Sequence, residues 1–182
     1  MQNYMIVCYY TDDDLYSKIV RNLIKDLTNL KLNCYFEKIN RIGDWNESAK
    51  YRPEFLLRML DKFKSPLVSL DADARVYSNP ILFENITTSL AMHKYGNYVW
   101  AAGTLYLKPI PKVVDILEQW KLACTVSSKR SGLILDSILK NYKDITNLPP
   151  TYCKIFDLMC EVKEPVIEHF QASRLAKRKF RN

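Results

Sequence analysis

The sequence has no uninterrupted apolar run of the roughly 18 to 20 residues that a membrane-spanning helix needs. Its first apolar segment, residues 5–10, leads directly into Asp12, Asp13 and Asp14, and no basic leader precedes it. We therefore expect neither a membrane span nor a signal peptide.

The chain is also poor in histidine, with two residues, and its five cysteines lack any C-x-x-C spacing. An odd number of cysteines argues against a disulfide framework, and the shortage of histidine argues against a structural zinc site. These absences predict a reducing, cytoplasmic environment. There the cysteines are expected to be small buried hydrophobic residues, since Cys8 and Cys34 lie in apolar runs.

Positive charge is concentrated at the carboxyl end of the chain. The net charge is +7, and much of it comes from residues 174–182. The basic side chains there are Arg174, Lys177, Arg178, Lys179 and Arg181. Such a cluster attracts polyanions, whether a diphosphate in a cleft, nucleic acid or an anionic membrane face. A solvated, frayed terminus is the alternative interpretation.

Hydrophobic residues make up 48% of the chain and suffice for one core, so we predict a single domain over 1–182 with a basic tail at 174–182. The β-branched and aromatic segment 4–10 predicts a strand, and the apolar periodicity of 15–30 predicts an amphipathic helix. The segment 32–39 predicts a second strand. Strand, helix, strand is the unit that builds a parallel sheet.

The rest of the chain continues this alternation. After a polar loop at 43–46, helical periodicity follows Pro53, and the apolar run 67–70 predicts a short buried strand. Further expected elements are a strand at 98–107, helices at 111–124 and 131–141, and a strand-like run at 165–170. The pattern predicts an α/β fold with a mostly parallel central sheet flanked by helices.

Asp71 and Asp73 directly follow the run 67–70, and in an open α/β sheet ligands bind beyond the carboxyl ends of the strands. In extended backbone, residues i and i+2 point to the same side, so the carboxylates can converge while Ala72 leaves the space between them clear. Converging carboxylates repel each other unless a cation lies between them. Mn²⁺ or Mg²⁺ suits this pair, because either ion keeps coordination positions for substrate phosphates.

Five motifs along the chain carry a resemblance to known enzymes. They are Tyr51-Arg52-Pro53-Glu54-Phe55, Leu70-Asp71-Ala72-Asp73-Ala74, Gly103-Thr104-Leu105-Tyr106, Leu148-Pro149-Pro150-x-Tyr152-Cys153 and Ile167-Glu168-His169-Phe170-Gln171-Ala172-Ser173-Arg174. Together they resemble short nucleotide-diphospho-sugar transferases from bacteria and bacteriophages, over residues 5–179. The resemblance implies a Rossmann-like GT-A fold and a metal-dependent glycosyltransferase with a nucleotide-sugar donor, a UDP-linked sugar being the first expectation. For a protein encoded by a bacteriophage, it implies the host cytoplasm.

The resemblance also implies roles for individual residues. Asp71, Ala72 and Asp73 contact the donor, both aspartates bind the metal, and His169 is the third metal ligand. Further donor contacts are implied for Tyr9, Tyr10, Thr11, Lys50, Arg52, Gly103, Thr104, Arg174 and Lys177. In this resemblance Tyr9, Tyr10 and Thr11 face the base and ribose, and Gly103 and Thr104 line the sugar. Either Lys50 or Arg52 faces the phosphates, and Arg174 and Lys177 are candidate phosphate clamps.

Several of these assignments have a structural alternative. Tyr9 and Tyr10 are equally consistent with packing against the sheet, and Gly103 with a bulge. Asp136 lies where related enzymes carry an Asp-Gln pair near the reacting sugar, but Ser137 follows it here. Asp136 is therefore either a catalytic residue or an exposed helix carboxylate.

The acceptor is left open by the sequence. After the donor-binding sheet, little of the 182-residue chain remains for a deep acceptor pocket, so we hypothesise an open face that binds a macromolecule. Candidates are a hydroxylated or hydroxymethylated base in phage DNA, a polysaccharide, a lipid-linked glycan or a protein.

Two other functions also fit parts of the sequence. The pI of about 9.1 and the basic tail are also typical of a non-catalytic nucleic-acid-binding protein. A nucleotide-sugar hydrolase or pyrophosphorylase could use the same pair of carboxylates.

Overall fold

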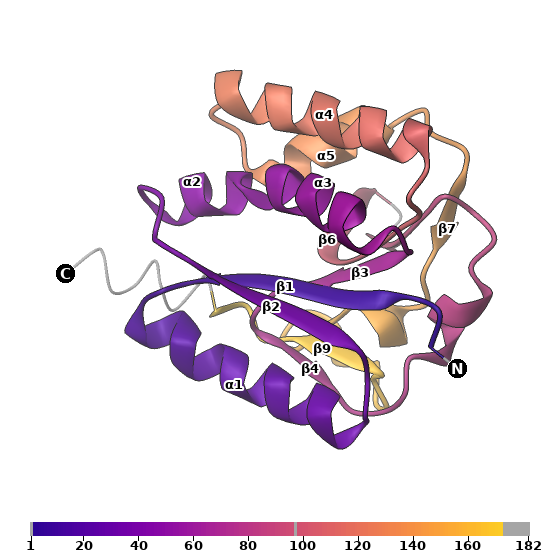
Figure 1. Ribbon diagram of the computed structural model, residues 1–182. Helices are drawn as coiled ribbons and strands as arrows, with labels where there is room; N and C mark the ends of the chain where they lie inside the picture. Colours follow the sequence, from indigo (N-terminus) through magenta and orange to yellow (C-terminus); the bar gives the residue numbers. More distant parts are fainter. Residues whose placement is uncertain (1, 97, 173–182) are drawn as a thin grey trace.

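The structure, a computed structural model, describes residues 2–96 and 98–172. A central sheet has the strand order β2-β1-β3-β6-β5-β7 (Figure 1). The strands are β1 Met5–Thr11, β2 Cys34–Ile39, β3 Leu67–Leu70, β5 Leu90–Tyr95, β6 Val99–Leu107 and β7 Ile145–Asn147. Strand β1 is parallel to β2 and β3, and β5 is parallel to β7, whereas β6 runs antiparallel to both of its neighbours.

The first strand separates two hydrophobic cores. Ile6 and Cys8 contribute to one core and Val7 to the other, as the twofold repeat of a strand requires. The first core includes the buried face of α1 Asp14–Asn29, and the second includes that of α3 Arg52–Phe63. Successive side chains of β1 therefore enter opposite cores, and the sheet is covered on both faces.

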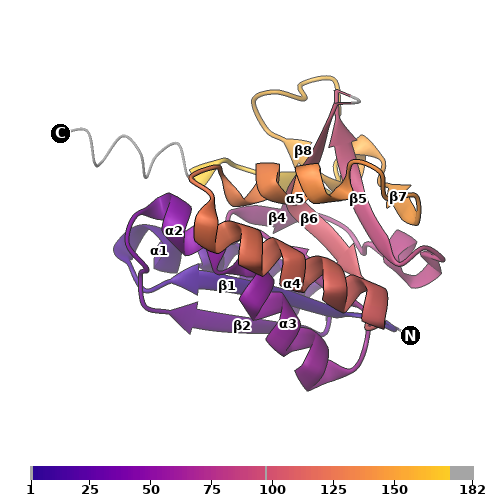
Figure 2. The same cartoon turned by 90° about the horizontal axis from the view of Figure 1, so that it is seen from above.

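Helices cover the two faces of the sheet. Helix α1 lies on one face, and α3, α4 Pro111–Val126 and α5 Ser131–Leu139 lie on the other (Figures 1 and 2). The carboxylate of Asp13 caps α1 by accepting the N–H groups of Leu15 and Tyr16. Strands β1 and β2 with α1 form the parallel unit predicted from the sequence. None of the helices in the described residues combines the length and the apolar content needed to cross a membrane.

A second sheet of three strands lies beside α1 and joins segments that are far apart in the sequence (Figure 1). Its strands, in spatial order, are β4 Ala74–Val76, β9 Ile167–His169 and β8 Lys154–Ile155. Arg75 of β4 forms two hydrogen bonds with Asp26 of α1, at 2.6 and 3.0 Å. Because β4 follows β3 closely and pairs with β9, the carboxyl end of β3 lies next to His169.

The α/β fold class predicted from the sequence is confirmed, and the structure differs in detail. The predicted loop at 43–46 leads into a helix, α2 Trp45–Lys50, because the Asp44 carboxylate accepts the N–H of Glu47 at 2.9 Å. Strand β5 was not predicted. It forms a hairpin with β6, so the sheet is less parallel than expected. Two short 3₁₀ helices span Ile81–Asn85 and Pro150–Tyr152.

Candidate metal centre

The chain turns after β3, and this turn carries Asp71 and Asp73. The N–H of Asp71 donates to the carbonyl oxygen of Gly103 at 3.1 Å, and the N–H of Ala74 donates to the carbonyl oxygen of Asp71 at 3.0 Å. Ala72, between the aspartates, is buried. The carboxylates therefore approach each other through a turn, and not through the extended backbone that the i, i+2 spacing suggested.

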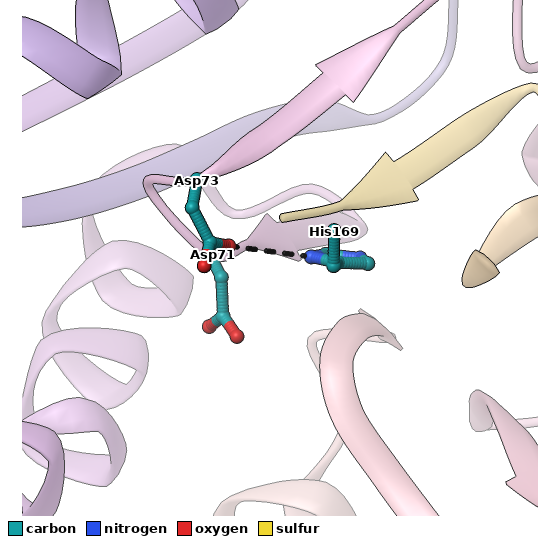
Figure 3. Close-up of side chains that lie close together, drawn as sticks. All are labelled: Asp71, Asp73 and His169. Carbon is teal, nitrogen blue, oxygen red and sulfur yellow. Dashed lines mark ion pairs between the residues drawn. The ribbon is translucent and has the colours of Figure 1, made fainter. Parts of the chain in front are cut away.

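His169 joins the two aspartates from the second sheet. Its strand, β9, pairs with β4 so that His169 lies opposite Ala74. Asp71, Asp73 and His169 each offer one ligand atom, and these atoms lie within 4.8 Å of one another. Figure 3 shows the imidazole ring facing the Asp73 carboxylate, with 3.8 Å between Nδ1 and Oδ1. This distance is too long for a hydrogen bond.

The two facing atoms are buried, and neither has a hydrogen-bond partner in the described part of the chain. The other polar atom of each side chain is paired. Asp73 Oδ2 accepts the N–H of Ala172 at 2.7 Å, and His169 Nε2 lies 2.8 Å from Thr104 Oγ1. Buried polar atoms are normally paired, so an unpaired oxygen that faces an unpaired ring nitrogen fits a bound cation. Carboxylate oxygen and imidazole nitrogen are both common ligands of divalent metals.

Asp71 has a cationic partner within the protein. Arg52, at the start of α3, bonds to Asp71 Oδ1 through Nη2 and donates from Nη1 to the carbonyl oxygen of Ala102 at 2.7 Å. The planar guanidinium thus connects α3 with the end of β3 and with β6. This ion pair engages one of the two carboxylate oxygens of Asp71.

Charges in the cluster shift the pKa values of its members. Burial acts to lower the pKa of His169, but Asp73, Cys153 and Asp71 outweigh burial and raise this pKa to about 10. Burial raises the pKa of Asp71, although the charge of Arg52 acts in the opposite direction. Burial also acts to raise the pKa of Asp73, but His169 lowers this pKa overall. Without a metal ion, the aspartates thus rely on Arg52 and His169 for charge compensation.

A cavity of about 820 Å³ opens beside the aspartates, where β1 and β3 end. Its volume lies in the range of small-molecule sites. The residues with a predicted donor contact that line it are Tyr9, Tyr10, Thr11, Arg52, Asp71, Ala72, Asp73 and Gly103. The fold thus brings residues from β1, α3, β6 and the turn after β3 to one cavity.

Two of the β1 residues in the cavity wall also support the fold. The hydroxyl of Tyr9 donates to the carbonyl oxygen of Ser48 at 3.1 Å, and its ring packs against Tyr51 and Phe55. The hydroxyl of Thr11 donates to the capping aspartate of α1 at 2.5 Å. These contacts fix both side chains in the wall, and their contact with a nucleotide stays a prediction.

Other predicted donor contacts lie away from the cavity or outside the described residues. Lys50 forms an ion pair with Glu47 at 2.8 Å and does not line the described cavity. Thr104 is fully buried behind the cavity wall. Arg174 and Lys177 lie outside the described residues.

Asp136 has a structural partner. Its carboxylate accepts the backbone N–H of Trp100 at 2.9 Å and so connects α5 to β6. Asp136 does not line the described cavity, although Trp100 does. The geometry therefore supports a role in holding β6, and the catalytic role of Asp136 stays a prediction.

The arrangement of the whole chain is shared with a protein of known structure. That protein is a glycosyltransferase involved in the glycosylation of the major capsid of PBCV-1. The match covers 100% of both chains, with a TM-score of 0.75 and 12% sequence identity. The chain therefore shares its fold with that glycosyltransferase. No protein-family model matches the sequence, and no curated protein matches it.

The cavity has further lining residues that the sequence did not predict. They include Trp45 at the start of α2, Trp100 in β6 and Arg130 at the N-cap of α5. A search for helix caps would have found the helix that carries Trp45, because Asp44 precedes it. No local pattern marks Trp100 or Arg130 as neighbours of the aspartates.

Proposed function

We propose that the protein is a metal-dependent glycosyltransferase that uses a nucleotide diphosphate sugar as donor. The observation that carries this proposal is the pair of unpaired buried atoms, Asp73 Oδ1 and His169 Nδ1, next to a cavity of about 820 Å³. The shared fold supports it, because the similar solved structure is that of a glycosyltransferase. We expect Mn²⁺ or Mg²⁺ as the metal and a UDP-linked sugar as the donor.

Asp71, Asp73 and His169 would hold the metal through the ligand atoms that lie within 4.8 Å of one another. A divalent cation supplies Lewis-acid chemistry there, because it stabilises negative charge on the departing nucleotide diphosphate. Asp73 Oδ1 faces the proposed metal position, and the N–H of Ala172 donates to Oδ2, so the carboxylate keeps one orientation.

In this proposal, the side chain of Arg52 offsets the negative charge of the donor's phosphates. Arg52 lines the cavity, and its guanidinium is held by Asp71 and Ala102. A fixed cation next to the phosphates offsets the charge that grows on them as the bond between sugar and diphosphate breaks. Tyr9 and Tyr10, at the end of β1, would contact the base and ribose in the same cavity.

We propose a polymer as the acceptor. The similar solved structure belongs to a protein involved in the glycosylation of a capsid. A modified base in phage DNA and a polysaccharide are the acceptors to test first, beside protein. Transfer to small free saccharides with none to any polymer would contradict this part of the proposal.

The alternatives make different predictions. A non-catalytic nucleic-acid-binding protein should lose affinity steeply with added salt and should bind equally well without the carboxylate of Asp73. A nucleotide-sugar hydrolase or pyrophosphorylase should release sugar or sugar phosphate without an acceptor. Product analysis therefore separates both from a transferase.

Calorimetric titration with a panel of nucleotide sugars, with Mn²⁺ and with EDTA, tests the proposal. We expect heat of binding only in Mn²⁺, and a rise in melting temperature with the same donor. Asp73→Ala should lose this binding while it stays folded. Asp61→Ala, which removes an exposed carboxylate paired with Lys64, should bind like wild type. Equal donor binding in EDTA and in Asp73→Ala would contradict the proposal.

A further inference from the structure

The ring of His169 lies directly against β6. The side chain is 2% exposed. A Cβ atom on Gly103 would lie 3.0 Å from Cε1 of His169 and 3.2 Å from each of the two ring nitrogens. Such contacts are shorter than ordinary van der Waals distances. The imidazole thus occupies the space that a side chain at position 103 would need.

One ring nitrogen of His169 contacts Thr104, and the other faces Asp73. The backbone of Thr104 pairs with Leu70 of β3, and its side chain is fully buried, so the hydroxyl has little freedom to move. Thr104 Oγ1 lies 2.8 Å from Nε2 of His169, and Nδ1 faces Asp73 at 3.8 Å. If the hydrogen on Nε2 is donated to Oγ1, a neutral imidazole has its free lone pair on Nδ1.

We propose that Thr104 and Gly103 are positioning residues that make Nδ1 of His169 the metal-binding atom. The inference rests on the metal-dependent function proposed above. It gives these two residues a role in the metal centre in place of the sugar contact that the resemblance implied. Hydrogen-bond partners behind a metal-binding histidine fix its ring orientation, and their loss weakens metal affinity about 10- to 100-fold.

Two substitutions at Thr104 distinguish the effect of its hydroxyl group from the effect of its side-chain shape. In calorimetric titrations with Mn²⁺ alone, Thr104→Val is expected to weaken binding about tenfold or more, whereas Thr104→Ser keeps the hydroxyl and stays close to wild type. Gly103→Ala should also weaken binding, because its new methyl group displaces the imidazole. Thr28→Val, at an exposed threonine of α1, is the matched control and should bind like wild type.

Nitrogen-15 NMR of the histidine rings supplies a readout that depends on neither a variant nor activity. The chain has two histidines. His93, whose Nδ1 lies 2.9 Å from the carbonyl oxygen of Leu148, is an internal reference. With diamagnetic Zn²⁺ as the probe, the expected spectrum of His169 has a metal-shifted Nδ1 and a protonated Nε2.

The possible outcomes separate this inference from the proposed function. A metal shift at Nε2 would overturn the positioning role alone. So would equal Mn²⁺ affinities of folded Thr104→Val and Thr104→Ser. Wild-type protein that binds no Mn²⁺ would overturn the metal-dependent function together with the inference.

Discussion

The two sheets of the molecule contribute to the candidate metal centre in different ways. The six-stranded sheet supplies the strand that leads into Asp71 and Asp73, and it also holds Thr104 on β6. The three-stranded sheet supplies His169, at the end of a three-residue strand. Asp71 and Asp73 are close together because they are two residues apart in the sequence. His169 reaches them only because β9 pairs with β4. The proposed ligand set is therefore complete only when both sheets are formed.

Asp73→Asn is expected to have the largest effect, because Asp73 lies between the two sheets and presents an unpaired oxygen to His169. Loss of a ligand charge should lower kcat/KM for sugar transfer by roughly 100-fold or more. Steady-state kinetics with the donor found by titration measure this. Asp61→Asn, at an exposed position on α3, is the control. Full activity of Asp73→Asn would contradict a metal centre that is built from both sheets.

A pair of histidine substitutions compares the two sheets directly. His169→Gln on β9 should weaken Mn²⁺ binding about 10- to 100-fold. His93→Gln on β5 removes the contact with Leu148 and should lower the free energy of unfolding by about 1 to 2 kcal/mol, with unchanged Mn²⁺ affinity. Calorimetry and urea denaturation measure the two effects. The reverse pattern, with weaker Mn²⁺ binding in His93→Gln and not in His169→Gln, would contradict the assignment of His169 as a metal ligand.

Asp26→Asn tests whether the second sheet depends on α1. Asp26 accepts hydrogen bonds from the Arg75 side chain and from the N–H of Val76. The Arg75 side chain is 34% exposed, so the loss should be moderate, about 1 to 2 kcal/mol in the free energy of unfolding. Urea denaturation measures it, and Mn²⁺ affinity should fall in parallel. Unchanged stability would mean that the second sheet is held by its apolar contacts alone.

The smallest effect is expected for Tyr77→Phe. The hydroxyl of Tyr77 donates to Glu168 at 2.9 Å, but Glu168 keeps its ion pair with Lys154, also at 2.9 Å. Stability should fall by about 0.5 to 1 kcal/mol, with no change in Mn²⁺ affinity. A loss of stability greater than that of Asp26→Asn would reverse the ranking of these two contacts.

The sequence predicts the larger sheet better than the smaller one, for a physical reason. Strand β1 is long enough to show its β-branched and aromatic composition, and helix α1 is long enough to show an apolar repeat of three to four residues. The strands of the second sheet have two or three residues each, too few to show a repeat, although the strand-like run at 165–170 does predict β9. They form because tertiary contacts pair them.

The same reason limits what the sequence predicts about the site. The position of Asp71 and Asp73 at the end of a strand is readable from local sequence, although a turn and not extended backbone brings the carboxylates together. The contact between Thr104 and His169 joins residues 65 positions apart, and no local pattern specifies it. His169 was therefore predicted only through the resemblance.

The most direct test of the metal centre is a crystal structure with Mn²⁺, in which the anomalous signal locates the ion. We predict a peak within about 2.5 Å of both Asp73 Oδ1 and His169 Nδ1, with Asp71 beside it. A well-ordered crystal in which saturating Mn²⁺ gives no peak between these side chains would contradict the account.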